Sequence, residues 1–228
     1  MTGPLAGRTV LLTRTGGLEE EIRARGADVR VLPVTRYEAV DAAADPESCD
    51  RVVFTSARAV AHCPFSVALA PRIACIGPQT ADVVREAGGT VDLVPDEHNA
   101  VALAAALVAD GVGPGTRVLF PCADIALATL EDRLGSAGAE VTRLVVYRTV
   151  PVGSIPADAA AGVDVIVFLS PSAVNAFAEL GGDLAAAPSL AIGRTTAAAL
   201  AAHGVTAEVA PTSDRAGVLA LLCEREWR

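Results

Sequence analysis

The feature that most constrains this chain is a stretch that occurs twice, in which an apolar strand ends at hydroxyl residues and turns directly into a helix. The second copy spans residues 163–174, and its strand is almost wholly apolar up to Ser170, as expected of a strand covered on both faces. Ser170 or Ser172 can cap the following helix, and Pro171 suits the first turn of that helix. The first copy, residues 52–60, shows the same order of strand, hydroxyls and helix.

Other landmarks repeat at a nearly constant spacing. The spacing is 116 residues for three pairs and 112 for an earlier one: Gly77 with Gly193, Pro95 with Pro211, Leu103 with Leu219, and Gly26 with Gly138. A small drift is what differing loop lengths produce, so we interpret the chain as an internal duplication of about 110 residues. Strands alternate with helices in each copy, which predicts an α/β fold with two doubly wound parallel-sheet domains.

The hydrophobic pattern and the Gly and Pro positions predict the individual elements. Strands are expected at residues 8–14, 29–34, 51–55, 72–77, 91–94, 117–120, 141–149, 165–170, 190–193 and 205–210. Helices are expected at residues 18–25, 79–87, 100–109, 124–134, 195–202 and 216–226. Two more follow the repeated stretch: one begins at about residue 57, and the other ends at residue 180. Residues 35–40 and 147–152 are expected to be extended connectors.

Composition excludes several classes of function. The net charge is −9 and all 18 basic residues are Arg, which argues against binding to nucleic acid or an anionic membrane and removes chemistries that need Lys. The sequence has no long apolar run and no basic region with an apolar core at Met1–Leu5, so we expect no membrane span and a cytoplasmic protein. The five Cys and three His lack metal-ligand spacing, and we expect neither a metal nor a cofactor.

Ligands of open parallel sheets bind beyond the carboxyl ends of the strands. The residues predicted there are hydroxyls, Gly, Pro, Gln and two Arg, which can bind carboxylates or phosphates together with helix N-termini. The candidate binding residues are Arg14, Thr55, Ser56, Gly77, Gln79, Thr80, Pro121, Ser170, Pro171, Ser172, Gly193, Arg194, Thr195 and Thr196. Ordinary helix caps and tight turns would use the same residue types, so both interpretations stay open.

Tyr147 is a further candidate, because it falls in an expected connector and its hydroxyl can donate a proton. Its alternative role is that of an amphipathic side chain packed at a hinge. Tyr37 falls in the other connector.

Taken in order, several pieces of the chain resemble the uroporphyrinogen-III synthase family. These pieces are Val-Leu-Leu-Thr-Arg (10–14), Val-Phe-Thr-Ser-Ala-Arg-Ala-Val (53–60), Ile-Gly-Pro-Gln-Thr-Ala (76–81), Val-Leu-Phe-Pro-Cys-Ala-Asp (118–124), Val-Val-Tyr-Arg-Thr (145–149), Val-Phe-Leu-Ser-Pro-Ser-Ala-Val (167–174) and Ala-Ile-Gly-Arg-Thr-Thr-Ala (191–197). The resemblance implies two lobes joined by two extended connectors, one formed by residues 1–35 with 152–228 and the other by 36–151.

The resemblance also implies a lyase that closes hydroxymethylbilane to uroporphyrinogen III, with inversion of ring D, loss of water and no cofactor. Tyr147 would be the acid, and the hydroxyl residues would bind the substrate's carboxylates. The ends at Thr55-Ser56 and Ser170-Ser172 would then face each other across a cleft. We further expect a monomer that makes transient contact with the enzyme supplying hydroxymethylbilane.

Some positions depart from the family pattern. The first helix is short, and Gly193-Arg194 replaces the commoner Gly-Pro. Two alternatives therefore stay open: a divergent family member that acts on another anionic substrate, and a non-catalytic two-lobed binding protein.

Overall fold

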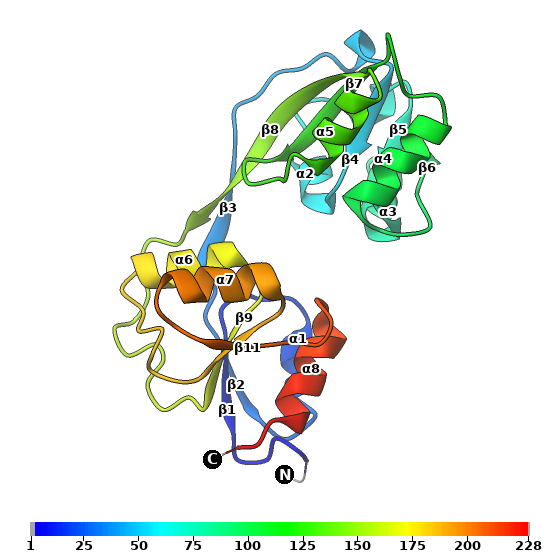
Figure 1. Cartoon of the computed structure of the whole chain (residues 1–228). Helices are drawn as coiled ribbons and strands as arrows, with labels where there is room; N and C mark the ends of the chain where they lie inside the picture. Colours follow the sequence, from blue (N-terminus) through cyan, green and yellow to red (C-terminus); the bar gives the residue numbers. More distant parts are fainter. Residues whose placement is uncertain (1–2, 228) are drawn as a thin grey trace. The chain divides into compact units, whose positions relative to one another are not determined.

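The computed structural model describes residues 3–227 (Figure 1). The chain divides into two compact units: unit 1 is Met1–Arg36 with Val150–Arg228, and unit 2 is Tyr37–Thr149. The chain passes from one unit to the other within strand β3 (Thr35–Ala39) and again within strand β8 (Glu140–Pro151). Among the described helices, none combines the length and the apolar character that a membrane span requires.

Unit 1 is built on a sheet with the strand order β11-β10-β9-β1-β2, and its neighbouring strands pair in parallel. Its strands are β1 (Thr9–Leu12), β2 (Asp28–Val31), β9 (Val165–Phe168), β10 (Ser189–Ala191) and β11 (Ala207–Val209). Its helices are α1 (Leu18–Arg23), α6 (Pro171–Glu179), α7 (Arg194–Ala202) and α8 (Arg215–Glu224).

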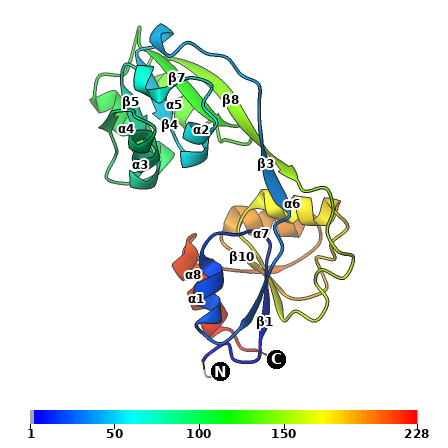
Figure 2. The same cartoon turned by 180° about the vertical axis from the view of Figure 1, so that it is seen from behind.

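Alternate residues of the unit 1 strands point to opposite faces of the sheet, as the period of a strand requires. Val10 and Leu12 pack into a core with α1 and α8, whereas Leu11 packs into a second core with α6 and α7. Figures 1 and 2 show these two pairs of helices on the two faces. Unit 1 is therefore doubly wound, as the alternation of strands and helices predicted.

Unit 2 has the strand order β3-β8-β7-β4-β5-β6. Its remaining strands are β4 (Arg51–Phe54), β5 (Ile73–Cys75), β6 (Val91–Leu93) and β7 (Arg117–Ala123). Helices α2 (Ala57–Ala61) and α3 (Pro78–Glu86) pack with Val52 and Phe54, whereas α4 (Ala100–Ala109) and α5 (Thr129–Ser136) pack with Val53. Short 3-10 turns occupy Pro46–Ser48 and Val67–Leu69.

The duplication is visible in the topology. The order β2-β1-β9-β10-β11 in unit 1 corresponds to β8-β7-β4-β5-β6 in unit 2, with the two copies of the repeated stretch at β9 and β4. Each unit thus combines strands from both copies: β1 and β2 of the first copy join β9, β10 and β11 of the second. In unit 2, β4, β5 and β6 of the first copy join β7 and β8 of the second.

Strand β7 is longer than predicted, because it continues through Pro121 to Ala123. The carbonyl of Arg117 accepts from Asp50 N and its N–H donates to Asp50 Oδ2, so both groups face β4. The alternation along β7 then turns Pro121 to the same side. The pairing of β4 with β7 ends at Val52 and Leu119, before Pro121. The missing N–H of Pro121 therefore removes no ladder bond, and the expectation that the strand ends at Phe120 is wrong.

Two further boundaries differ from the prediction. Helix α5 begins at Thr129 rather than at Asp124, because the carbonyls of the preceding segment bind the side chain of Arg143. The segment expected as an extended connector at residues 35–40 is extended, and its residues 35–39 form strand β3 at the edge of the unit 2 sheet. The extended structure of β8 continues to Pro151.

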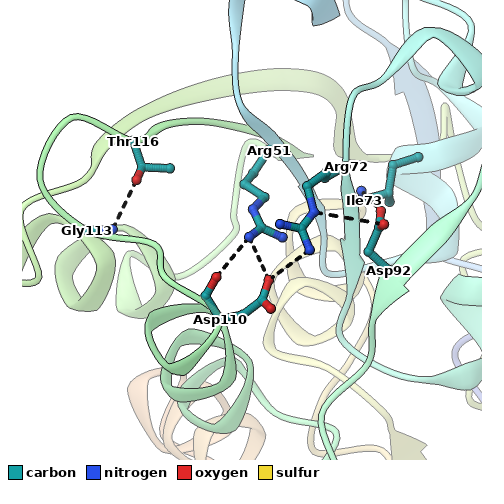
Figure 3. Close-up of polar contacts among 7 residues, drawn as sticks. All are labelled: Arg51, Arg72, Ile73, Asp92, Asp110, Gly113 and Thr116. Carbon is teal, nitrogen blue, oxygen red and sulfur yellow. Dashed lines mark hydrogen bonds and ion pairs between the residues drawn. The ribbon is translucent and has the colours of Figure 1, made fainter.

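A polar network lies at the amino ends of β4 and β5 in unit 2 (Figure 3). Arg51 is only 5% exposed, and its Nη2 lies 2.6 Å from Asp110 Oδ2 and donates to the Asp110 carbonyl. Arg72 reaches the same carboxylate at 3.4 Å, while Asp92 accepts a bond from the backbone N–H of Ile73. This network lies at the edge of the sheet opposite to the carboxyl ends of the strands.

Candidate functional site

Each unit has one point at which the strand order reverses. In unit 1 strand β1 lies between β2, which follows it in the chain, and β9. In unit 2 strand β7 lies in the same way between β8, which follows it in the chain, and β4. Ligands of open α/β sheets bind outside the carboxyl ends of the strands at such points. The residues found there are Thr13-Arg14 and Ser170 in unit 1, and Asp124 and Thr55-Ser56 in unit 2.

The repeated stretch has the predicted local structure in both units. Ser170 Oγ accepts a bond from Ala173 N at 3.2 Å and so caps α6, whose first residue is Pro171. Ser56 Oγ accepts from Ala59 N at 3.1 Å and caps α2. Ser170 also lies 3.0 Å from Ser172 Oγ. Each capping hydroxyl keeps a proton that it can donate to a second partner.

In unit 2 the Ser56 hydroxyl also lies beside the hydroxyl of Tyr147, and either of the two can donate to the other. The two oxygens lie 3.3 Å apart, and Tyr147 is 7% exposed. The ring meets Tyr37 edge to face at 5.8 Å and lies 5.6 Å from the ring of His62. The Arg58 guanidinium stacks on Tyr37 at 3.4 Å from the ring centroid. Unit 2 therefore gathers two hydroxyls, two further rings and one cation beside the end of β4.

The position of Tyr147 depends on an irregularity between β7 and β8. Cys122 pairs with Val145, but the next residue of β7, Ala123, pairs with Tyr147, so that Val146 is skipped. Such a bulge redirects the side chains that follow it, and bulges are frequent beside functional sites. The sequence placed Tyr147 in an extended segment but gave no sign of the bulge.

Gly77 and Gly193 immediately precede helices α3 and α7 and cap them without a side-chain hydrogen bond. Both have an extended backbone with φ of −170°, which any residue can adopt. Crowding favours glycine instead: a Cβ atom would lie 3.1 Å from His98 Cγ at Gly77 and 2.6 Å from Ser213 Oγ at Gly193. The N–H groups at such helix starts are suited to anions.

The start of α7 opens onto a cavity of about 540 Å³. Its lining residues are Gly193, Arg194, Thr195, Val209, Ala210, Pro211 and Ser213. Arg194 and Thr195 are exposed. Three of the candidate residues of unit 1 thus share one opening on the surface.

The other candidates differ in accessibility. Gln79 and Pro171 are exposed, and Arg14, Thr55 and Ser172 are half-buried. The side chains of Thr80 and Thr196 are almost wholly buried, and Pro121 lies buried inside β7. These three contribute packing at the site's edge, whereas the exposed and half-buried residues can reach a ligand with their side chains.

Three of the described cysteines, Cys63, Cys75 and Cys122, are poor nucleophiles. Burial raises the pKa of Cys75 to about 12 and that of Cys63 and Cys122 to about 11, so these thiols stay protonated near neutral pH. Within residues 3–227, no three His, Cys, Asp or Glu side chains gather closely enough to hold a metal ion. The chemistry of the described site therefore rests on hydroxyls, backbone N–H groups and arginines.

Two residues that contact the rings of Tyr37 and Tyr147 were missed by the sequence reasoning. Arg58 and His62 occupy the first turn and the end of α2, but only the fold brings them to the rings of Tyr37 and Tyr147. The sequence places Arg58 two residues after the capping Ser56 but carries no local signal for its contact with Tyr37.

Comparisons with known proteins agree with the resemblance seen in the sequence. Residues 17–220 match the family model described as uroporphyrinogen-III synthase HemD. The chain is 30% identical over 207 residues to the uroporphyrinogen-III synthase of Synechococcus elongatus, which covers 78% of this chain and 76% of the relative. The chain therefore belongs to the uroporphyrinogen-III synthase family, an enzyme family of tetrapyrrole biosynthesis.

Solved structures support the fold. The uroporphyrinogen-III synthetase of Helicobacter pylori matches with a TM-score of 0.68 at 16% identity, covering 94% of this chain and 97% of that one. A mutant uroporphyrinogen III synthase of Thermus thermophilus matches with a TM-score of 0.54 at 19% identity, covering 94% and 96%. The predicted α/β fold with doubly wound parallel sheets is confirmed.

Proposed function

We propose that this protein converts hydroxymethylbilane into uroporphyrinogen III, with inversion of ring D and loss of one water molecule. The observation that carries the proposal is the Ser56–Tyr147 hydroxyl pair at the carboxyl edge of the unit 2 sheet. It lies in a chain that matches the synthase family over residues 17–220. A part-buried hydroxyl pair at this edge supplies the mild acid that departure of a hydroxyl group requires.

The substrate carries eight carboxylates, which need hydrogen-bond donors rather than a basic protein surface. The net charge of −9 makes attraction by the protein as a whole unfavourable, so recognition is local. Gly77, Ser170 and Gly193 cap the starts of helices α3, α6 and α7, where the N–H groups of the first turn and the helix dipole favour anions. Arg194 and Thr195 add a cation and a hydroxyl at the α7 cavity.

The reaction begins when the terminal C–O bond of the substrate breaks. Tyr147 donates its proton to the leaving hydroxyl, which departs as water and leaves an azafulvene-type cation on the bilane. The substituted carbon of ring D attacks this cation to give a spiro intermediate, which reopens and closes again with ring D inverted. The proton lost on rearomatisation returns to the Tyr147 oxygen.

No electrons enter or leave in this sequence, and its only by-product is water. A redox or group-carrying cofactor is therefore unnecessary in the proposed reaction. The protein mainly holds a flexible chain in one folded shape, and orientation of this kind lowers a barrier by several kcal/mol, on the order of 7 or more in favourable cases.

The test is to supply hydroxymethylbilane to the purified protein and separate the uroporphyrinogen isomers. We expect the type III isomer to form in proportion to the amount of protein. Formation of the type I isomer alone, as in spontaneous closure, would refute the proposal. Tight binding of the bilane without type III product would instead identify a binding protein.

A further inference from the structure

Arg143 on strand β8 makes an unusual number of contacts with one short segment. Its Nη1 lies 2.6 Å from Glu131 Oε2 on α5. Its Nη2 donates to the carbonyl of Ala126 at 2.8 Å and to those of Ala123 and Asp124 at 3.3 Å each. One guanidinium thus binds both the segment that follows β7 and helix α5, which comes after that segment.

These contacts explain why residues 124–128 do not join α5. In a helix that began at Asp124, the carbonyls of Asp124 and Ala126 would accept N–H bonds from the residues four positions further on. Arg143 binds those carbonyls instead, and α5 begins only at Thr129. The guanidinium therefore determines the path of the backbone after β7.

That backbone is bonded in turn to the strand segment that carries Tyr147. Asp124 N donates to the Tyr147 carbonyl at 3.1 Å, and Asp124 Oδ1 accepts from Thr149 N at 3.4 Å. Ala123, whose carbonyl binds Arg143, is also the residue paired with Tyr147 across the bulge. Two of the residues that Arg143 binds, Ala123 and Asp124, are thus the ones that face the backbone of Tyr147 from β7.

We infer that Arg143 is a positioning residue for the Tyr147 hydroxyl. By holding residues 123–126 against β8, it fixes the bulge and so the direction in which Tyr147 points toward Ser56, 3.3 Å away. Its guanidinium acts through its bonds to Glu131 and to the backbone carbonyls of residues 123, 124 and 126. The inference rests on the proposed function, because it concerns the proton that Tyr147 donates there.

The test is a double-mutant cycle on the full chain with hydroxymethylbilane as substrate. Arg143→Met keeps the length of the side chain but removes its bonds, and we expect kcat to fall about tenfold with KM changed less than twofold, since a small misplacement of a catalytic group is costly. Arg143→Lys keeps the charge and should recover part of the loss. In the Tyr147→Phe background, Arg143→Met should lower kcat no further.

A matched control is Arg133→Met on the exposed face of α5, which should leave kcat unchanged. Equal losses of kcat with and without the Tyr147 hydroxyl would overturn the inference, as would a Tyr147→Phe variant with full activity. If Arg143→Met does not fold, the same cycle with Arg143→Lys shows whether the loss of kcat depends on the Tyr147 hydroxyl or not. A wild-type protein that yields only the type I isomer refutes the proposed function and this inference with it. If the wild type makes type III but the losses of kcat from the Arg143 and Tyr147 substitutions are additive, only the inference is refuted.

Discussion

Asp50 and Asp164 make the same backbone bonds at equivalent places in the two units. Asp164 N donates to the Thr9 carbonyl at 2.8 Å, and Asp164 Oδ2 accepts from Thr9 N at 2.7 Å. Asp50 repeats both bonds with Arg117, each at 2.8 Å. In each unit the Asp precedes the strand of the repeated stretch and ties it to a strand from the other copy of the duplication.

The first prediction concerns the acid stability of this contact. The bonded Arg117 side chain holds the pKa of Asp50 below its ordinary value. A carboxyl whose pKa is lowered by folding stabilises the protein above its unfolded-state pKa, about 3.9, and that contribution is lost as the pH falls through the lower folded-state value. Asp50→Asn should therefore lose stability at pH 7 and approach the wild type as the pH falls below about 4.

Urea unfolding of both proteins at a series of pH values measures this convergence. Asp158→Asn, at an exposed turn of unit 1, serves as the control and should follow the wild type at every pH. A constant difference between wild type and Asp50→Asn from pH 7 to pH 3 would contradict the prediction.

The second prediction concerns Tyr147 itself. Tyr147→Phe keeps the ring that packs against Tyr37 and His62 but removes the hydroxyl bonded to Ser56. We expect kcat to fall by about 10² to 10⁴, which is the usual contribution of a general acid, with a change in unfolding free energy of about 1 kcal/mol. Steady-state kinetics with isomer separation, together with thermal unfolding, measure both effects.

Tyr37→Phe is the matched control, because Tyr37 lies beside Tyr147 but is 37% exposed. It should keep most of the wild-type kcat. Unchanged kinetics in Tyr147→Phe would remove this residue from the mechanism.

The sequence predicted the parts of the fold that local pattern determines. The two strand-to-helix stretches, the capping role of Ser170 and the helix at 100–109 followed from apolar runs, hydroxyls and glycines that act within a few residues. The duplication could be recognised from the sequence for the same reason, because the repeated residues form local turns or caps. These features depend little on what packs against them.

The errors arose where a distant residue determines the backbone. The continuation of β7 through Pro121 depends on where β4 ends, and the late start of α5 depends on Arg143, in a different strand. Likewise, the contacts of Arg58 and His62 with the rings of Tyr37 and Tyr147 join residues from separate elements. A single sequence contains no local signal for such contacts.

The third prediction concerns the network in Figure 3. Asp110→Ala leaves the Arg51 guanidinium buried without its carboxylate, and the Nη1 atom of Arg51 is already without a partner among the described residues. Because Asp110 is itself partly exposed, we expect the free energy of unfolding to fall by about 2 kcal/mol rather than the larger cost of a fully buried pair. Denaturant titration measures the loss.

Asp82→Ala is the control for that experiment, because Asp82 pairs with Arg85 on the exposed face of α3. Its loss should stay within about 0.5 kcal/mol. Equal effects of the two substitutions would show that the Arg51 pair gives no more than a surface contact.

The last prediction concerns the cavity at the start of α7. In Gly193→Ala the new Cβ atom would lie 2.6 Å from Ser213 Oγ, so Ser213 must shift within the cavity that both residues line. Because this cavity is proposed to bind a substrate carboxylate, KM should rise about tenfold with a smaller change in kcat. Adding Ser213→Ala removes the clashing hydroxyl and should restore KM to within about threefold of the wild type. Ser213→Ala alone serves as the reference, and a Gly193→Ala variant with wild-type KM would show that the substrate does not use this cavity.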